Sequence, residues 1–163
     1  MDVFPLPCLH DNYAYLLVCP QTQATAVVDP SAAEPVQVEL QRRGLSLTAI
    51  LNTHHHWDHV GGNEALLAKS PGIRIFGHAS DRGRIPGQTE FLEVGDVVRF
   101  GKIAGRILHN PGHTSGAISY VFGDQAFTGD TLFAAGCGRV FEGTMEQMHH
   151  SLNGVLGGLP DPT

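Results

Sequence analysis

Apolar residues along the chain fall into short runs separated by turns that are rich in glycine, proline and aspartate. Such runs, apolar or alternating, are typical of β-strands. The pattern predicts strands at 3–6, 13–19, 24–28, 47–51, 73–76, 97–100, 106–108, 118–122 and 125–127. The last four pair as two hairpins, because Gly101-Lys102 and Gly123-Asp124 are turn sequences that join antiparallel strands.

Helix signals lie between the predicted strands. Ser31–Glu34 and Thr144–Gln147 resemble capping boxes, in which a hydroxyl side chain begins a helix, and Gly44 is a typical helix end. The pattern predicts helices up to about Arg43, over Gly62–Lys69 and up to about Asn153, and a loop over 80–96. Strands with helices inserted between them, in a chain of 163 residues, indicate one domain over 1–163 with a layered α/β sandwich.

Charge and cysteine content narrow the class of protein. The formal net charge of −6 argues against a nucleic-acid or membrane-surface partner. The chain shows neither a membrane span nor a basic, then apolar, leader, so a cytoplasmic protein is expected. Cys8, Cys19 and Cys137 are odd in number and lack the Cys-x-x-Cys spacing. Neither a disulfide framework nor a thiolate zinc cluster is therefore expected.

A run of histidines follows the predicted strand at 47–51. Residues 53–62 read Thr-His-His-His-Trp-Asp-His-Val-Gly-Gly. In an extended segment alternate side chains share a face, so His54 and His56 project together while His55 points away. Asp58 and His59 follow the strand end, where a turn can aim them at a neighbouring position. Imidazole and carboxylate ligands suit zinc, iron or manganese, so the run predicts a metal site.

Two other strand ends carry possible ligands. His113 lies in the loop Asn110–Gly116, between two predicted strands, where glycine and proline form a rigid turn. Asp130 follows the strand at 125–127. Loops at the ends of rigid strands commonly carry binding residues, so three strand ends are expected to contribute to one site.

The remaining candidates have simpler interpretations. Asp29, which precedes Pro30, is expected to be a turn or capping residue, and Tyr13 a core residue. Cys137, between two glycines, has no assigned base and is expected to be a small buried side chain in a tight loop. Solvated surface positions are expected for His10, His78, His109, His149 and His150.

The motifs resemble those of the metallo-β-lactamase fold superfamily, and within it of glyoxalase II, the hydroxyacylglutathione hydrolases. The pattern His54-x-His56-x-Asp58-His59 is the superfamily signature. The most specific likeness to glyoxalase II is Gly136–Thr144, which ends in Phe-Glu-Gly-Thr. The likeness extends over nearly the whole chain and includes Asp11–Tyr13, Pro111–Gly116 and Phe127–Phe133.

The resemblance implies a four-layer αββα sandwich that contains two metal ions, with zinc expected and iron or manganese as alternatives. Hydroxide held between the ions attacks the thioester of S-D-lactoylglutathione and releases D-lactate and glutathione. Asp58 also orients this nucleophile, Arg139 binds a glutathione carboxylate, and Phe141 occupies a substrate position where relatives often carry tyrosine. The ligand roles that the resemblance implies are His54, His56 and His113 for the first ion, Asp58 and His59 for the second, and Asp130 for both.

The chain stops at Thr163, before the family's further histidine ligand and its helical glutathione-binding domain. The sandwich and the second metal site are therefore expected to be incomplete, and the thioesterase activity of the chain to be low or absent. Exposed core faces and a free sheet edge favour a homodimer.

Two alternatives remain open at this stage. A persulfide dioxygenase shares the fold but holds one iron through two histidines and an aspartate, and Phe141–Thr144 argues against it. A non-catalytic domain that is stabilised by metal is the second alternative. Metal-dependent stability without hydrolysis of any thioester distinguishes that domain from an enzyme.

Overall fold

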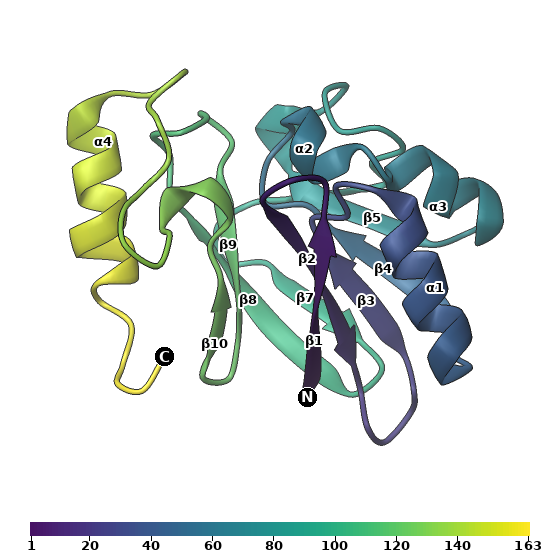
Figure 1. Ribbon diagram of the computed structural model, residues 1–163. Helices are drawn as coiled ribbons and strands as arrows, with labels where there is room; N and C mark the ends of the chain where they lie inside the picture. The colour runs from purple at the N-terminus through teal and green to yellow at the C-terminus, as the bar shows by residue number, and fades with distance from the viewer.

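The computed structural model describes residues 1–163 as two β-sheets packed face to face, with helices on both outer sides (Figure 1). In the first sheet, β1 to β3 pair antiparallel, and β3 to β6 pair parallel. The second sheet is antiparallel throughout and has the order β10-β9-β8-β7. The strands of the first sheet, in order, are β1 (Asp2–Cys8), β2 (Asn12–Val18), β3 (Thr25–Val28), β4 (Leu47–Leu51), β5 (Arg74–His78) and β6 (Glu90–Leu92). Those of the second are β7 (Val97–Phe100), β8 (Ile103–His109), β9 (Ile118–Phe122) and β10 (Gln125–Phe127).

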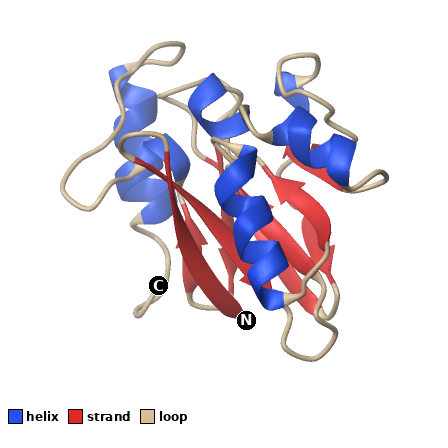
Figure 2. Ribbon diagram, turned by 45° about the vertical axis from the view of Figure 1, so that its right-hand side comes forward, coloured by secondary structure: helices blue, strands red, loops and turns tan.

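Helices complete the four layers. The first sheet is covered by α1 (Ala33–Arg43) and α3 (Asn63–Lys69), whereas α4 (Met145–His150) and a π-helical stretch, Ser151–Leu156, lie beside the second sheet (Figure 1). Figure 2, turned from this view, again places the strands between helices. The short helix α2 (Trp57–Val60) follows the histidine run. This is the αββα sandwich that the resemblance to the metallo-β-lactamase superfamily implies. None of the helices is both long and apolar enough to cross a membrane.

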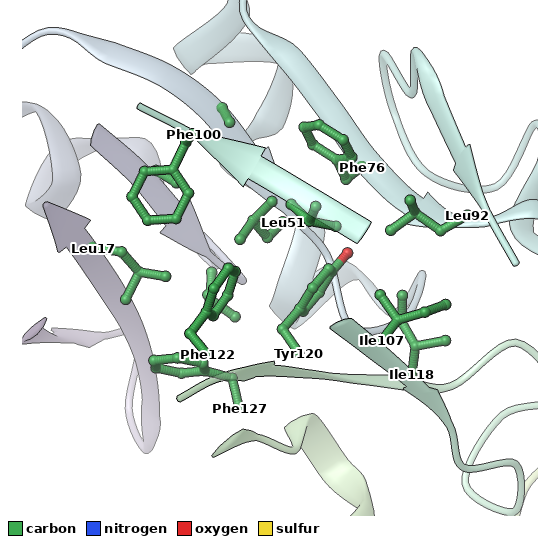
Figure 3. Packing of buried hydrophobic residues seen from close by; sticks show 14 of the residues in the cluster. Leu17, Leu51, Phe76, Leu92, Phe100, Ile107, Ile118, Tyr120, Phe122 and Phe127 are labelled. Carbon is green, nitrogen blue, oxygen red and sulfur yellow. The ribbon is translucent and has the colours of Figure 1, made fainter. Parts of the chain in front are cut away.

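The main core lies between the two sheets (Figure 3). Leu51 and Phe76 from the first sheet pack there with Phe100 and Tyr120 from the second. The buried hydroxyl of Tyr120 donates a hydrogen bond of 2.9 Å to the backbone carbonyl of Asn52. This bond joins the second sheet to the residue that follows β4, one position before the histidine run begins.

A second core lies between the first sheet and its helices. Ile50 on β4 packs there in one cluster with Val36 and Leu40 of α1 and Leu66 of α3. Because β4 is covered on both faces, it carries an almost continuous apolar run rather than an alternating one.

The predicted elements are mostly confirmed, with four corrections. The predicted loop at 80–96 contains β6, which was missed because three residues are too few to show a period. The capping box predicted at Ser31 is absent, because α1 begins after Ala32 without a side-chain cap. The box at Thr144 is present. Tyr13 is 54% exposed, because it borders an open hollow rather than the core. Cys137 is exposed, because it borders a surface hollow rather than the core.

Replacing Tyr120 by Phe should lower the free energy of unfolding by about 1–3 kcal/mol, because the buried carbonyl of Asn52 loses its donor. Urea denaturation measures the change. Tyr13→Phe, at an exposed position, is the matched control and should shift the free energy by less than about 0.5 kcal/mol. Equal losses in the two variants would show that the bond between the sheets contributes nothing specific.

Candidate metal centre

The histidine run begins where β4 ends and turns sharply into α2. Thr53 is fixed from two sides, because its amide donates to Asp29 Oδ1 at 2.8 Å and its carbonyl accepts from Ile118 N at 2.9 Å. Behind the run, Gly61 and Gly62 approach the segment 30–32 closely. A Cβ atom on either glycine would lie 2.6 Å from a backbone carbonyl oxygen of that segment. The glycine pair therefore lets the run pack against the start of α1.

Three of the predicted ligands form a first group. Nitrogen atoms of His54, His56 and His113 lie within 4.8 Å of one another, which is close enough for one cation. His113 Nε2 lies 2.9 Å from His56 Nδ1. The loop between β8 and β9 thus brings His113 to the histidine run, although 57 positions separate it from His56.

A second group shares His54 and lies beside the first. It consists of His54, His59 and Asp130, whose ligand atoms also lie within 4.8 Å of one another. Asp130 Oδ1 is 3.1 Å from His59 Nε2, and Asp130 Oδ2 is 3.3 Å from His113 Nε2. The two oxygens of this carboxylate therefore face the two groups. Asp58 lies at the margin, with Oδ2 at 3.7 Å from His59 Nε2.

The outward nitrogens of the imidazoles are held by the fold. Nδ1 of His54 lies 3.0 Å from Thr53 Oγ1, and Nδ1 of His59 lies 2.9 Å from Asp29 Oδ2. Thr53 Oγ1 itself lies 2.6 Å from Asp29 Oδ2 and donates its proton there, so it accepts from His54. In both histidines Nδ1 is thus the donor, so in the neutral ring the lone pair lies on Nε2.

The inward nitrogens test whether a cation fits. Nε2 of His54 is buried and has no hydrogen-bond partner, and Nε2 of His59 is buried and faces only the Asp130 carboxylate, at 3.1 Å. His113 has the same orientation, because its Nδ1 donates to the Arg139 carbonyl at 2.7 Å. Buried polar atoms normally find a partner, and ligating histidines normally donate their other N–H to the protein. The donor set therefore fits a divalent cation such as zinc, iron or manganese.

The charges of the site also fit a cation. Burial, together with the neighbouring imidazoles, lowers the pKa of His54 and of His56, so both rings are neutral and ready to bind. Burial opposes the charge of His59 as well, but Asp29 and Asp130 outweigh it and raise the pKa of His59 to about 10. Burial raises the pKa of Asp130, and contact with His59 reverses that effect and lowers it. In the metal-free chain a proton on His59 therefore occupies the position of a cation.

Two supporting residues were missed or misjudged from the sequence. Asp29 is not a simple turn residue, because it is buried and binds both Thr53 and His59. Parallel pairing of β3 with β4, in which Val28 stands opposite Leu51, brings Asp29 beside the histidine run. Asn12 donates to the Asp58 carbonyl at 3.0 Å and to Asp58 Oδ2 at 3.3 Å. The strand pairing is the only signal that could have indicated Asp29.

A hollow of about 610 Å³ opens over the two groups. The predicted substrate residues Arg139 and Phe141 line it, and the guanidinium carbon of Arg139 lies 4.9 Å from the centre of the Phe141 ring. A second and more apolar hollow of about 720 Å³ meets the first at Asp130 and Phe133. The structure thus places both predicted substrate residues at the edge of the candidate centre.

The other histidines lie outside the two groups. His55 points away and bonds to Asp81 at 3.1 Å. His78 and His109 stack on each other with ring centroids 4.6 Å apart, so they are not simply solvated as expected. Exposed positions are found for His10, His149 and His150.

Comparison with known proteins identifies relatives over the whole chain. The sequence profile of the Metallo-beta-lactamase superfamily matches residues 10–161. A curated relative from Synechococcus sp. (strain JA-2-3B'a(2-13)), named "Hydroxyacylglutathione hydrolase", is 54% identical over 165 residues. That match covers 100% of this chain and 65% of the relative, so the chain spans about two thirds of the relative's length.

Solved structures show the same architecture. The BLEG-1 B3 metallo-beta-lactamase superposes with a TM-score of 0.87 at 25% identity, over 98% of this chain and 87% of that one. The protein TTHA1623, solved in a di-iron-bound form, gives a TM-score of 0.77 at 28% identity, over 98% of this chain and 88% of that one.

Asp29→Asn should weaken metal binding by about 10- to 100-fold, because an amide nitrogen cannot accept the proton of His59 Nδ1. Asn tolerates the left-handed backbone of this position, where φ is 45°, so the change tests the contact rather than the turn. Competition with a chelating dye measures affinity. Asp124→Asn, in the exposed β9–β10 turn, is the matched control. Equal affinity of the two variants would remove Asp29 from the site.

Metal binding should release protons, because a cation that takes His59 Nε2 displaces the proton held there at neutral pH. The affinity should therefore rise with pH toward about 10, the pKa of His59. Calorimetric titration in buffers of different ionisation enthalpy measures the release. His59→Asn should release about one proton fewer than the parent chain. Identical proton release would mean that His59 stays outside the coordination sphere.

Proposed function

The chain belongs to the metallo-β-lactamase superfamily, and we propose that its function is the hydrolysis of a glutathione thioester, S-D-lactoylglutathione, to D-lactate and glutathione. The main support is the pair of ligand groups that share His54 and face one carboxylate, Asp130, beneath a hollow lined by Arg139. The hydrolase name of relatives that align with the whole chain also supports it, and the dioxygenase and the non-catalytic domain are not better supported.

We assign six residues to two cations. The first group, His54, His56 and His113, would hold one ion, and Asp58 with His59 would hold the other. Asp130 would serve both, because its oxygens face both groups. Bound zinc, or iron or manganese in its place, supplies a Lewis acid and lowers the pKa of a coordinated water.

The other roles belong to side chains around this centre. Asp58, held by Asn12, orients the attacking water by accepting one of its protons in a hydrogen bond. The guanidinium of Arg139 binds a glutathione carboxylate, for which its planar fork is well suited. Phe141 lines the same hollow and is assigned to substrate contact. The leaving group is a thiolate, which is stable enough to depart without a general acid.

The setting of the protein is proposed on the same basis. Three free cysteines support a reducing compartment such as the cytoplasm. The homodimer and the low turnover that the sequence led us to expect stay predictions. When the protein is present in excess over the thioester, even a slow reaction can be measured as a single turnover.

Loss of S-D-lactoylglutathione under these single-turnover conditions tests the function. The zinc-loaded chain should consume the thioester, a chelator should abolish the reaction, and added zinc should restore it. If chelator-treated and zinc-loaded chains consumed it equally slowly, the proposed function would be wrong.

Replacing Arg139 by Met should raise the protein concentration for half-maximal rate by about tenfold, the effect of losing about 1.4 kcal/mol of binding. The rate constant at saturation should change little, because Arg139 binds the carboxylate and not the reacting atoms. Arg99→Met is the matched control, since Arg99 is exposed on β7 and absent from the hollow. An equal shift in both variants would separate Arg139 from substrate binding.

A further inference from the structure

The loop that carries Arg139 and Phe141 lies directly on the loop that carries His113. Phe141 N donates to the His113 carbonyl at 3.2 Å, and His113 Nδ1 donates to the Arg139 carbonyl at 2.7 Å. Gly143 N donates to Gly112 O at 3.1 Å. These contacts join the candidate ligand His113 and the Arg139–Phe141 segment, which forms a wall of the hollow, into one unit.

Glu142 fastens this unit to the rest of the fold. Its Oε2 accepts from Ser115 N at 2.9 Å and from Ser115 Oγ at 3.0 Å. The guanidinium of Arg84, which lies 58 positions earlier in the sequence, donates to both carboxylate oxygens of Glu142. The hydrogen bond from Arg84, supported by those from Ser115, lowers the pKa of Glu142 to about 2, so the carboxylate is charged throughout the neutral range.

The same network reaches the histidine run through His55. Nδ1 of His55 donates to Asp81 Oδ1 at 3.1 Å, and Nε2 of His55 accepts from Arg84. Asp81 is fully buried, and a Cβ atom on Gly116 would lie 2.7 Å from its carboxylate. The loop that follows His113 therefore rests on Asp81, and the network connects it to the residue between His54 and His56.

A role in stability alone explains this arrangement poorly. The Arg84 side chain is 40% exposed and that of Glu142 is 26% exposed, and ion pairs at such sites contribute little to stability. Each anchored residue, however, is close in sequence to a residue of the candidate centre. His55 lies between two candidate ligands, Ser115 lies two positions after His113, and Glu142 follows Phe141.

We propose that Glu142, held by Arg84, is a positioning residue that fixes the His113 loop and the Arg139–Phe141 wall relative to the histidine run. Its effect on substrate binding rests on the proposed function, whereas its effect on His113 does not. Glu142 borders the hollow, but its carboxylate is engaged by Arg84 and Ser115, so it acts through Ser115 and the backbone of the wall.

Affinity for Co²⁺ alone, measured by competition with a chelating dye, tests the proposal. Glu142→Gln should weaken Co²⁺ binding by about 10- to 100-fold, as expected when support of a ligand is lost. The matched control is Glu39→Gln, because Glu39 also pairs with two arginines, Arg42 and Arg43, and has a pKa lowered to about 2, but lies on α1. Affinities of the two variants within about twofold of each other would overturn the proposal.

Arg84→Gln provides a second variant, which carries the same expectation if Glu142→Gln does not fold. Arg84→Lys should recover part of the lost affinity, since it restores the charge. The loss in the double variant Arg84→Gln/Glu142→Gln should be smaller than the sum of the single losses, because the two side chains act as one pair. Additive losses would show that the two side chains do not act as a pair, and a lower urea midpoint with unchanged Co²⁺ affinity would show a structural role only; either result would overturn the proposal.

Trp57 offers a readout of the wall that does not depend on turnover. It is the single tryptophan, it is 71% exposed, and it lines the hollow with Arg139 and Phe141. An S-alkyl glutathione, which has a thioether in place of the thioester, should quench its fluorescence and bind Glu142→Gln about tenfold more weakly than Glu39→Gln.

Weaker Co²⁺ binding in a chain that hydrolyses no thioester would reject the proposed function and leave the positioning of His113 intact. Unchanged Co²⁺ binding in a chain that hydrolyses the thioester would reject the positioning role of Glu142 and leave the proposed function intact.

Discussion

The ring of His54 lies 4.2–4.9 Å from three other imidazole rings, in a part of the molecule that water scarcely reaches. Four imidazoles at this spacing cannot all carry protons, and the inward Nε2 of His54 has no partner within the protein. Burying such atoms without a partner is unfavourable. The arrangement therefore favours a positive charge among these rings, which a proton on His59 or a divalent cation supplies.

The two sheets bring the ends of their strands to one place, so that the ligand residues surround the same charge. The ligand segments follow β4, β8 and β10, and parallel pairing of β3 with β4 adds Asp29 beneath them. The bond from Tyr120 to Asn52 then joins the sheets at the residue before the histidine run. The packing of the core and the position of the first ligands are therefore linked. A shift of one sheet against the other would move His113 and Asp130 away from His54.

Local patterns in the sequence predicted much of this architecture, and they failed for identifiable reasons. The bounds of β4, β9 and β10 were predicted because their apolar runs are ended by turn residues. β6 has only three residues, too few for a period. The six candidate ligands could be selected because imidazoles and carboxylates at strand ends are unusual. Asp29 could not be selected, because its role depends on strand register, which no local pattern contains. Glu142 depends in the same way on Arg84, 58 positions away.

The candidate site has a buried floor of ligand residues and an exposed rim of aromatic residues around the hollow, and substitutions in the two parts have different effects. The floor residues His54, His59 and His113 are buried, and each has its outward nitrogen fixed by the fold. The rim residues Trp57, Phe133 and Phe141 are 71%, 47% and 56% exposed. A substitution in the floor disturbs several buried contacts at once, whereas a substitution in the rim alters mainly which molecules the hollow accepts. Proteins that share this floor can therefore differ in substrate through the rim, which is consistent with a fold that does not by itself determine function.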